Sequence, residues 1–440
     1  MNRIMLVLAA ASLLGGCGIL GKGDKKTTPT IGQRISVLGT EKSIEVDPEL
    51  AGVPVTVPPS AVNVDWAQPG GNAAKSMGHV ALGAAPAMAW RVSIGEGSSN
   101  AGQLASSPVV AEGKIFTIDT QAVVRAFDAT TGAALWVSAV RGEAASGKVL
   151  FGGGVAYDNG RVFATNGAGY AAAIDAKTGG HFWQVRLGGP LRGAPTIAND
   201  NVYVVSQDNQ LFALDPADGK PRWPPASGAA EQAGVFGTAS PAAAQGTVVA
   251  GFSSGELNAY RYENGRILWQ DALARTSIST AVTTLSDIDA DPVIDAGRVY
   301  AIGQGGRMVA LELVTGQRVW EINVAGIATP WVAGDWVFVV TDEAKLLAIA
   351  RGTGKVRWMT QLRRYRDEKD KKGNIRWVGP LLAGDRLVLV SSLGQILNVS
   401  PADGTIQSAV ESRMPVSLPP VVANNTLYIL SDTGHLTAWR

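Results

Sequence analysis

The chain has 440 residues, and its 38 basic and 37 acidic side chains give a formal net charge of +1. A balance this even excludes a broad electrostatic attraction to nucleic acid. Hydrophobic residues make up 46% of the chain and 53 residues are glycine, which indicates many short strands joined by tight turns and not a disordered chain. Three histidines and one cysteine leave little material for a metal site and none for an internal disulfide.

The N-terminus has the organisation of an export signal. Arg3 supplies a positive charge, residues 4–14 form an apolar run, and Leu14-Gly15-Gly16-Cys17 ends that run with small residues. The run is too short to span a bilayer comfortably. The Leu-Gly-Gly-Cys ending resembles a bacterial lipoprotein signal, which implies that residues 1–16 are removed and that Cys17 is lipidated. A chance cysteine in an ordinary signal peptide is the alternative.

The segment after Cys17 is expected to connect a membrane anchor to a folded domain. Acyl chains on Cys17 would tether the protein to a membrane without a transmembrane helix. In such lipoproteins the residue after the lipidated cysteine influences sorting, and glycine at position 18, in place of aspartate, resembles the outer-membrane class. Residues 17–60 are polar at their start and carry several prolines, so we expect a flexible tether. Residues 61–85 are expected to pack as an ordered lead-in.

One sequence frame recurs through the rest of the chain. The segments Ala126–Trp136, Ala173–Trp183 and Ala213–Trp223 share the pattern Ala-x-Asp, a glycine four residues after the aspartate, and a tryptophan four residues after the glycine. Looser copies end at Trp269, Trp320 and Trp358. A period of roughly 40–50 residues built from short strands is typical of a β-propeller blade.

Counting sets of three strands predicts eight blades. Their third strands end near Asp128, Asp175, Asp215, Arg261, Glu312, Ala350, Ser400 and Arg440. Turn-forming residues fill the first hairpin of each blade, at Glu112-Gly113, Asn159-Gly160, Asp200-Asn201, Gln245-Gly246, Ala296-Gly297, Gly334-Asp335, Gly384-Asp385 and Asn424-Asn425.

The two ends of the chain complement each other. The last repeat stops where its third strand ends, and the segment around Trp90 resembles a fourth strand whose preceding strands are missing. Pairing these ends in one blade closes the ring and removes exposed sheet edges. We therefore predict an all-β fold over residues 86–440: an eight-bladed β-propeller of four-stranded antiparallel blades, closed by pairing the N-terminal strand with the C-terminal strands.

The repeating tryptophan is expected to fill the wedge between neighbouring sheets, because one large ring at each blade buries much apolar area. An aromatic platform for a ligand is the alternative. The seventh copy has Ile406-Gln407-Ser408 in place of tryptophan. We expect a weaker contact between blades at that point.

Two short motifs suggest chemistry, but each lacks the context that its chemistry needs. Gly251-Phe-Ser253-Ser-Gly255 matches a nucleophile elbow, yet it falls in a turn between strands, and His181 belongs to another blade. Asp287-Ile-Asp289-Ala-Asp291 begins like a calcium loop but has proline at the sixth position and arginine at the twelfth. We therefore expect no catalytic residue and no metal, and an acidic rim is the favoured interpretation.

Connections between blades point to one docking face. Strand direction repeats in every blade, so all connections from the outer strand of one blade to the inner strand of the next emerge on the same side. Binding surfaces usually occupy loops held by a rigid scaffold. We expect this face to present an exposed tip at Leu191 and Arg192, an acidic tip at Asp287 and Asp289, and a long charged insertion at 363–376. The mixed signs of the insertion argue against nucleic-acid binding.

The repeat frame resembles that of the quinoprotein (PQQ) propellers. With the N-terminal lipoprotein signal, the whole chain resembles the BamB family of lipoproteins in the bacterial outer-membrane β-barrel assembly (BAM) machinery. Leu191-Arg192-Gly193 and the segment 285–293 resemble the loops by which that family contacts BamA. The resemblance implies that Leu191, Arg192, Asp287 and Asp289 bind BamA, although Gly189 stands where another leucine is expected.

The resemblance implies a non-enzymatic scaffold without a cofactor. It would sit on the periplasmic face of the outer membrane, dock on the periplasmic POTRA domains of BamA, and help to fold and insert unfolded outer-membrane protein precursors. The alternatives are a PQQ-dependent quinoprotein dehydrogenase and a periplasmic propeller that binds other envelope components.

Overall fold

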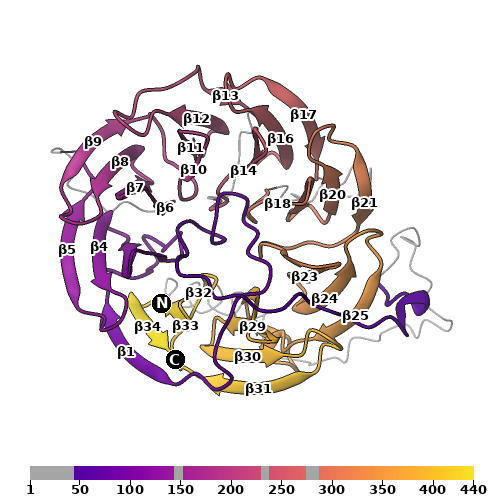
Figure 1. The fold of residues 1–440 in the computed structure, drawn as a ribbon. Helices are drawn as coiled ribbons and strands as arrows, with labels where there is room; N and C mark the ends of the chain where they lie inside the picture. The colour runs from indigo at the N-terminus through magenta and orange to yellow at the C-terminus, as the bar shows by residue number, and fades with distance from the viewer. Residues whose placement is uncertain (1–43, 143–151, 229–236, 274–286) are drawn as a thin grey trace, which may run out of the picture. The chain divides into compact units, whose positions relative to one another are not determined.

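The computed structural model describes residues 44–142, 152–228, 237–273 and 287–440. Cys17 and the signal segment lie outside the described residues. Within these ranges eight four-stranded antiparallel sheets are arranged around a ring, as the sequence predicts (Figure 1). No helix of the described segments is long and apolar enough to cross a membrane.

The strands of the first four blades follow one another in the chain. Blade 1 contains β2 (Val109–Ala111), β3 (Lys114–Ile118), β4 (Val123–Asp128) and β5 (Ala134–Ala139). Blade 2 contains β6 (Gly153–Asp158), β7 (Arg161–Asn166), β8 (Tyr170–Asp175) and β9 (His181–Arg186). Blade 3 contains β10 (Thr196–Ala198), β11 (Asn201–Val205), β12 (Gln210–Leu214) and β13 (Ala226–Ser227). Blade 4 contains β14 (Ala242–Ala244), β15 (Thr247–Gly251), β16 (Glu256–Arg261) and β17 (Ile267–Ala272).

The remaining blades include the closure and one inserted hairpin. Blade 5 contains β18 (Val293–Asp295), β19 (Arg298–Ile302), β20 (Met308–Glu312) and β21 (Arg318–Ile322). Blade 6 contains β22 (Trp331–Ala333), β23 (Trp336–Val340), β24 (Lys345–Ala350) and β25 (Val356–Gln361). The inserted hairpin contains β26 (Tyr365–Asp367) and β27 (Lys372–Asn374). Blade 7 contains β28 (Trp377–Ala383), β29 (Arg386–Ser391), β30 (Gln395–Val399) and β31 (Ile406–Glu411). Blade 8 contains β32 (Val421–Ala423), β33 (Thr426–Leu430), β34 (His435–Trp439) and β1 (Met88–Ser93).

Blade 8 confirms the predicted closure. β1 pairs with β34 in antiparallel register, and Trp90 lies opposite Ala438. Beyond the strands, the backbone amides of Ala87 and Arg440 each donate to the carbonyl of the other, at 2.7 and 2.9 Å. The last strand of the chain therefore has a partner, and the ring has no open blade.

The first hairpin of each blade is a tight turn of the expected kind. Glu112, Asn159, Gln245 and Ala296 take positive φ angles, and each is followed by a glycine that does the same. In blade 3 the two residues with positive φ are Asn199 and Asp200, one position earlier than the predicted Asp200-Asn201. The shift follows from the strand register, because Ala198 pairs with Asn201 and leaves 199–200 as the turn.

The repeating tryptophan joins seven of the eight blades to the next one. Its ring lies against the turn glycine of the following blade, where an added Cβ would come within 2.5–2.9 Å of indole atoms. Its indole N–H donates to a carbonyl of the same turn in six of the blades. The pairs are Trp90–Gly132, Trp136–Gly179, Trp183–Gly219, Trp223–Gly265, Trp269–Gly316, Trp320–Gly354 and Trp358–Gly404. The expected wedge-filling role is thus confirmed, and it explains why glycine and tryptophan recur together.

Blade 7 lacks the tryptophan for a topological reason. Ser408 occupies its register position opposite Asn398, where other blades pair tryptophan with alanine. A tryptophan at this position would need the turn between the third and fourth strands of blade 8. In blade 8 these strands are β34 and β1, the two ends of the chain, so that turn does not exist. All six residues of β31 are exposed, in agreement with the expected weaker contact.

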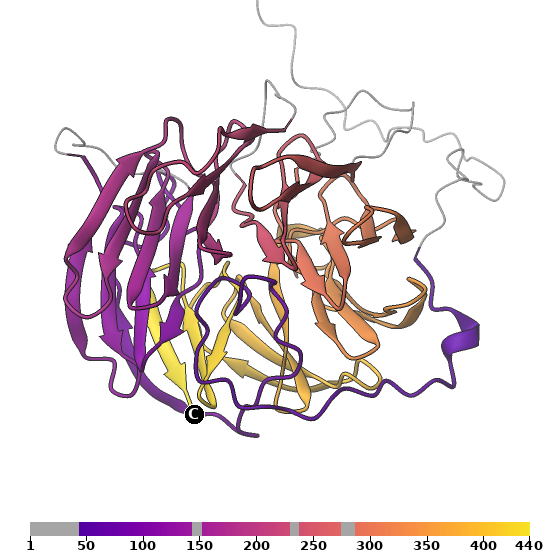
Figure 2. The same ribbon diagram turned by 45° about the horizontal axis from the view of Figure 1, so that its top comes forward.

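The lead-in makes a circuit inside the ring (Figures 1 and 2). Between residues 63 and 80 it bonds to the first strand or first turn of each blade in turn, starting from blade 8. The bonds are Asn424 N to Asn63 O (2.7 Å), Val110 N to Trp66 O (2.9 Å), Tyr157 N to Ala67 O (2.7 Å), Ile197 N to Gln68 Oε1 (3.0 Å), Ala243 N to Ala73 O (2.8 Å), Ile294 N to Ala74 O (2.8 Å), Trp331 Nε1 to Gly78 O (2.7 Å) and Gly384 N to Val80 O (3.0 Å). The innermost strands thus gain partners for groups that a sheet edge leaves unpaired.

The end of the expected tether also lies along the propeller. Residues 44–60 include the short 3₁₀ helix η1 (Pro48–Leu50). Val46 bridges Val356 of β25, and the Asp47 amide donates to the Val356 carbonyl at 2.8 Å. Lys355 Nζ lies 3.1 Å from Asp47 Oδ2. A stretch that we expected to be flexible therefore follows the outer strand of blade 6, because it offers backbone groups and charges that this strand can pair.

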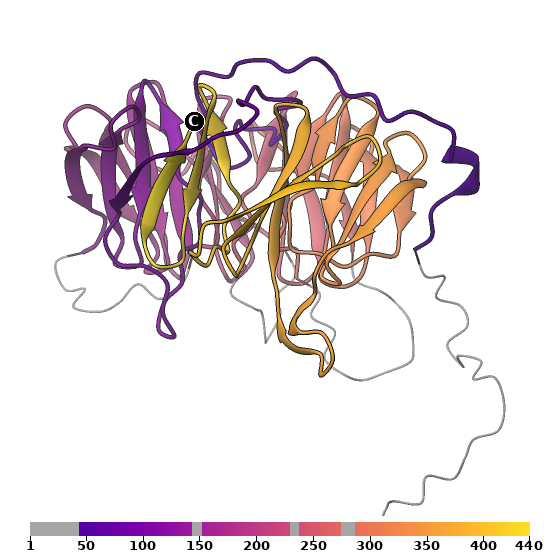
Figure 3. The ribbon, with the colours of Figure 1, turned by 90° about the horizontal axis from the view of Figure 1, so that it is seen from below.

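The two faces of the ring differ in what covers them. Figure 3 shows the lead-in on one face and the hairpin of β26 and β27 projecting from the opposite face. We call the second one the loop face; it carries the connections from the outer strand of each blade to the inner strand of the next.

Replacing one docked tryptophan tests the contact between blades. We expect Trp183→Ala to lower the free energy of unfolding by about 3–5 kcal/mol, because it removes a buried ring that packs on Phe163 and Gly219. Ser408→Ala, at the same register position in blade 7, should change it by less than about 0.5 kcal/mol. Denaturant unfolding followed by tryptophan fluorescence and by circular dichroism gives both values. Equal losses in the two variants would contradict this role of the tryptophan.

Candidate docking site

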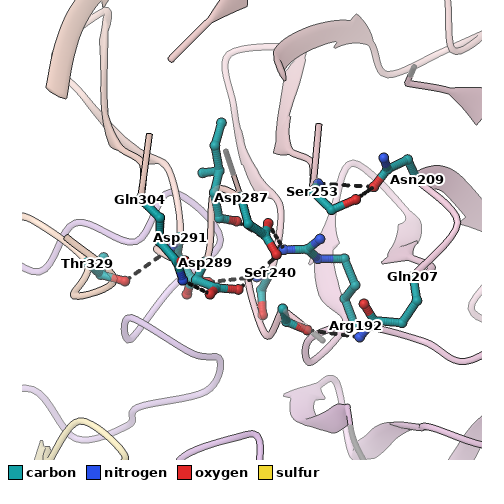
Figure 4. A network of polar contacts seen from close by, with 12 residues as sticks. Arg192, Gln207, Asn209, Ser240, Ser253, Asp287, Asp289, Asp291, Gln304 and Thr329 are labelled. Carbon is teal, nitrogen blue, oxygen red and sulfur yellow. Dashed lines mark hydrogen bonds and ion pairs between the residues drawn. The ribbon is translucent and has the colours of Figure 1, made fainter. Parts of the chain in front are cut away.

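Three of the four predicted site residues form one cluster on the loop-face side of the ring (Figure 4). Arg192 follows β9 in the connection from blade 2 to blade 3, and Asp287 and Asp289 precede β18 of blade 5. Arg192 Nη2 donates to Asp287 Oδ1 at 2.7 Å and to the Ile288 carbonyl at 3.1 Å, and it lies 3.5 Å from Asp289 Oδ1. Two connections far apart in the chain are therefore joined by charge.

The expectation that Leu191 and Arg192 form an exposed tip is wrong. Both residues are fully buried, with 0% of their surface exposed, and the exposed part of the connection is 188–190. The chain has already entered blade 3 at this point, because the Arg192 amide donates to the Val205 carbonyl at 2.8 Å. Leu191 then packs in the apolar core between blades 2 and 3.

A glycine makes room for the buried guanidinium. A Cβ on Gly237 would overlap Arg192 Nη2, and it would also approach Asp289 Oδ1 to 2.5 Å. Arg192 Nε, Arg192 Nη1 and Asp287 Oδ2 have no hydrogen-bond partner among the described residues. Buried polar atoms are usually paired, because leaving one unpaired costs about 1–3 kcal/mol. Within the described ranges, the cluster thus has two donors and one acceptor that are not used in hydrogen bonds.

Asp289 is the member of the cluster closest to solvent. Its side chain is 13% exposed, and Gln304, from the second turn of blade 5, donates to Oδ2. Burial and, to a smaller extent, the neighbouring Asp287 raise the pKa of Asp289 to about 6, against the opposing charge of Arg192. The carboxylate of Asp289 therefore takes up its proton near pH 6, which ordinary buffers reach.

The sequence placed Asp291 with Asp287 and Asp289 in an expected acidic rim. In the structure Asp291, like Asp289, is partly buried, and its Oδ1 accepts the Ser240 amide at 2.7 Å. The regular spacing of two residues between Asp287, Asp289 and Asp291 is the one sequence signal that these three aspartates belong to the same site. The described residues contain no group of three or more histidine, cysteine or acidic side chains arranged to hold a metal.

The serine of the motif that resembles a nucleophile elbow makes a contact between neighbouring blades. Ser253 lies in the turn between β15 and β16 and is buried. Its hydroxyl donates to Asn209 Oδ1 of the neighbouring blade at 2.8 Å. His181 Nε2 lies 2.9 Å from Ser138 Oγ, between blades 1 and 2. The serine and the histidine therefore belong to different contacts between blades.

Comparison with known proteins finds relatives of the same name over most of the chain. A family model described as outer membrane protein assembly factor BamB matches residues 87–152 and 120–360. The chain is 25% identical over 367 residues to the outer membrane protein assembly factor BamB of Yersinia pestis, which covers 80% of this chain and 88% of that relative. It is 26% identical over 354 residues to the protein of the same name from Escherichia coli strain K12, with 79% and 87% covered.

Solved structures share the fold. The crystal structure of BamB from Moraxella catarrhalis matches with a TM-score of 0.65 at 20% identity, over 81% of this chain and 98% of that one. A quinohemoprotein alcohol dehydrogenase from Comamonas testosteroni matches with a TM-score of 0.67 at 14% identity, over 86% and 81%. At these identities the similarity establishes the propeller fold alone.

The titration of Asp289 predicts a pH dependence of stability. The folded state keeps this proton up to about pH 6, whereas the unfolded chain releases it near 3.8. Between these values the folded state binds more protons, so this group makes the free energy of unfolding fall as pH rises from about 4 to about 6. Denaturant unfolding of the wild type and of Asp289→Asn across this range should show that the variant lacks this part of the decrease. Identical pH profiles would contradict the shifted titration.

Proposed function

Since the chain belongs to the BamB family of outer membrane protein assembly factors, we propose that it is a non-enzymatic scaffold of the BAM complex. The loop face docks on the periplasmic POTRA domains of BamA. The ring stays rigid while BamA and an unfolded outer-membrane protein precursor are brought together, which assists folding and insertion of the precursor. A lipid on Cys17 holds the protein on the periplasmic face of the outer membrane.

The Arg192 cluster is the observation that supports this docking site. It joins the connection before blade 3 to the connection before blade 5 through a buried guanidinium. In this proposal Asp289 reaches the partner directly. Leu191, Arg192 and Asp287 set the position of the surface above them, and the unpaired nitrogens of Arg192 become available to partner carbonyls or carboxylates if the connection opens.

The charged hairpin extends the same face. The acidic side chains of the hairpin make contacts within the hairpin. Glu368 accepts hydrogen bonds from the amides of Arg364 and Tyr365, and Asp370 lies 3.4 Å from Lys372 Nζ. The exposed cationic residues of the hairpin are Arg363, Arg366, Lys369, Lys371, Lys372 and Arg376. Residues 363–376 carry seven basic and three acidic side chains, so the hairpin gives the loop face a predominantly basic tip that can steer an acidic partner surface.

A bulky substitution on the exposed part of the docking loop tests the proposal. A Cβ at Gly189 would lie 4.0 Å from its nearest neighbour, Asp208 Oδ1, so Gly189→Trp should fold normally. We expect it to weaken capture of purified BamA POTRA domains at least tenfold, because the indole would stand inside the interface.

Gly352→Trp is the matched control for this substitution. Gly352 is exposed in the turn between β24 and β25, on the face opposite the loop face, and a Cβ there meets nothing within 4 Å. We expect this variant to bind like the wild type, with affinities measured by biolayer interferometry. Failure of the wild type to bind the POTRA domains, or equal binding by both variants, would rule out docking at this loop.

A further inference from the structure

The hairpin of β26 and β27 concentrates the positive charge of the chain. Residues 363–376 have seven basic and three acidic side chains and hence a net charge of +4; because the whole chain has a net charge of +1, the remainder carries −3. All residues from 366 to 374 are exposed, and none of them has an apolar side chain. We call residues 366–374 the basic tip.

The base of the hairpin is fixed to blade 7. Trp377 Nε1 donates to the Arg363 carbonyl at 2.9 Å, and the Ile375 amide donates to the Arg364 carbonyl at 2.8 Å. Ile375 and Trp377 are buried. A hairpin of two strands is marginally stable on its own, so these contacts keep the basic tip projecting from the loop face (Figure 3).

Three cations of the basic tip have no partner in the protein. The acidic side chains are engaged by the hairpin itself, since Asp367 Oδ1, for example, accepts the Asp370 amide at 3.0 Å. Within the described ranges no side-chain hydrogen bond or ion pair is made by Arg366, Lys369 or Lys371. Their charged groups are therefore available to an external anion.

The composition of the basic tip fits a layer of anionic headgroups better than a protein surface. Protein interfaces are centred on buried apolar or aromatic anchors and are depleted in lysine, and the basic tip has no such anchor. An anionic lipid surface needs none, because each lysine or arginine close to it raises the affinity by charge alone, about fivefold.

The hairpin lies across the ring from the docking loop. The loop at 188–190 connects blade 2 to blade 3, whereas the hairpin connects blade 6 to blade 7. In a ring of eight blades these connections are half a turn apart, on opposite sides of the axis (Figure 1). The two surfaces can therefore contact two different partners.

The end of the tether meets the propeller at the strand that leads into the hairpin. Val46 bridges Val356 of β25, the Asp47 amide donates to the Val356 carbonyl at 2.8 Å, and η1 lies outside this strand (Figure 1). The chain that follows Cys17, the proposed lipid site, thus joins the folded domain at the blade from which the hairpin leaves. A lipid chain together with a basic patch is a combination that holds proteins on anionic membranes.

We propose that the basic tip is a contact site for an anionic lipid surface. Arg366, Lys369 and Lys371 lie against phosphate-bearing headgroups of the membrane that holds the lipid anchor, while the docking loop across the ring remains for BamA. This inference rests on the proposed function for the identity of the membrane, but the charge of the basic tip alone sets the kind of surface.

Binding to vesicles of defined charge tests the inference. The chain from residue 17 to 440 carries Cys17→Ser, so that no acyl chain is attached, and is sedimented with vesicles of phosphatidylcholine alone or mixed equally with phosphatidylglycerol. The tip variant is Arg366→Gln, Lys369→Gln and Lys371→Gln. The control variant removes three exposed cations without an ion pair in blades 8, 2 and 4 and so has the same net charge: Arg91→Gln, Lys177→Gln and Arg266→Gln.

We expect the parent chain to bind the mixed vesicles in about 0.1 M salt, to leave them in about 0.5 M salt, and not to bind phosphatidylcholine vesicles. The tip variant should lose at least tenfold in partition onto the mixed vesicles, because three charges near the headgroups are gone. The control variant should stay within twofold of the parent chain. A variant that keeps the charges, Arg366→Lys with Lys369→Arg and Lys371→Arg, should bind like the parent chain.

The outcomes separate this inference from the proposed function. Equal vesicle binding by the tip and control variants, or equal binding of the parent chain to both kinds of vesicle, would show that the inference is wrong. It is also wrong if the tip variant keeps its vesicle binding and instead loses capture of BamA POTRA domains, because the basic tip then touches the protein partner. If the wild type captures no POTRA domain but the tip variant leaves the mixed vesicles, the inference stands and the docking proposal fails.

Discussion

The contact of each tryptophan with the turn glycine of the following blade is the interaction on which the ring depends. A blade buries its inner strands but leaves its outer strand half in solvent, so neighbouring blades need a large apolar group to fill the widening space between them. The indole of the tryptophan fits only because the turn residue that it packs against is a glycine, which has no Cβ. This glycine adopts a positive φ, between 67° and 78° in the seven turns concerned. The contact recurs in seven of the eight blades, so most neighbouring blades pack on each other in the same way.

Closure leaves a second problem at the centre of the ring. The innermost strands are short, and most have three residues, so one edge of each would face the axis without a partner. The lead-in solves this by passing every blade once and bonding to each. Trp66 adds packing to these bonds, since it bridges Val110 of blade 1 while its ring stacks on Trp331 of blade 6, with centroids 6.2 Å apart. The lead-in is consequently part of the propeller core.

A buried cluster of charges lies at the connections before blades 3 and 5. The buried guanidinium of Arg192 joins two connections that the ring alone would leave independent. Two of its nitrogens have no hydrogen-bond partner among the residues that the structure describes, whereas buried polar atoms are usually paired. Buried pairs of this kind are weak evidence for stability but strong constraints on position, because one charge cannot move without exposing the other. A docking surface built on such a cluster gains precision from the scaffold below it and not from its own exposed residues.

The sequence by itself determined the features that repeat locally. The number of blades, the closure through Trp90 and the pairing of glycine with tryptophan all follow from short patterns, because a hairpin and its turn are encoded by neighbouring residues. The absence of tryptophan at Ser408 was visible too, but its cause was not, since it depends on which blade contains the chain ends. Only the tertiary structure decided that Arg192 is buried and bonded to Asp287, 95 positions away, and that Lys75 faces blade 3 at Thr196, 121 positions away. Such contacts depend on how the blades and the lead-in are placed around one axis, and no local pattern records that placement.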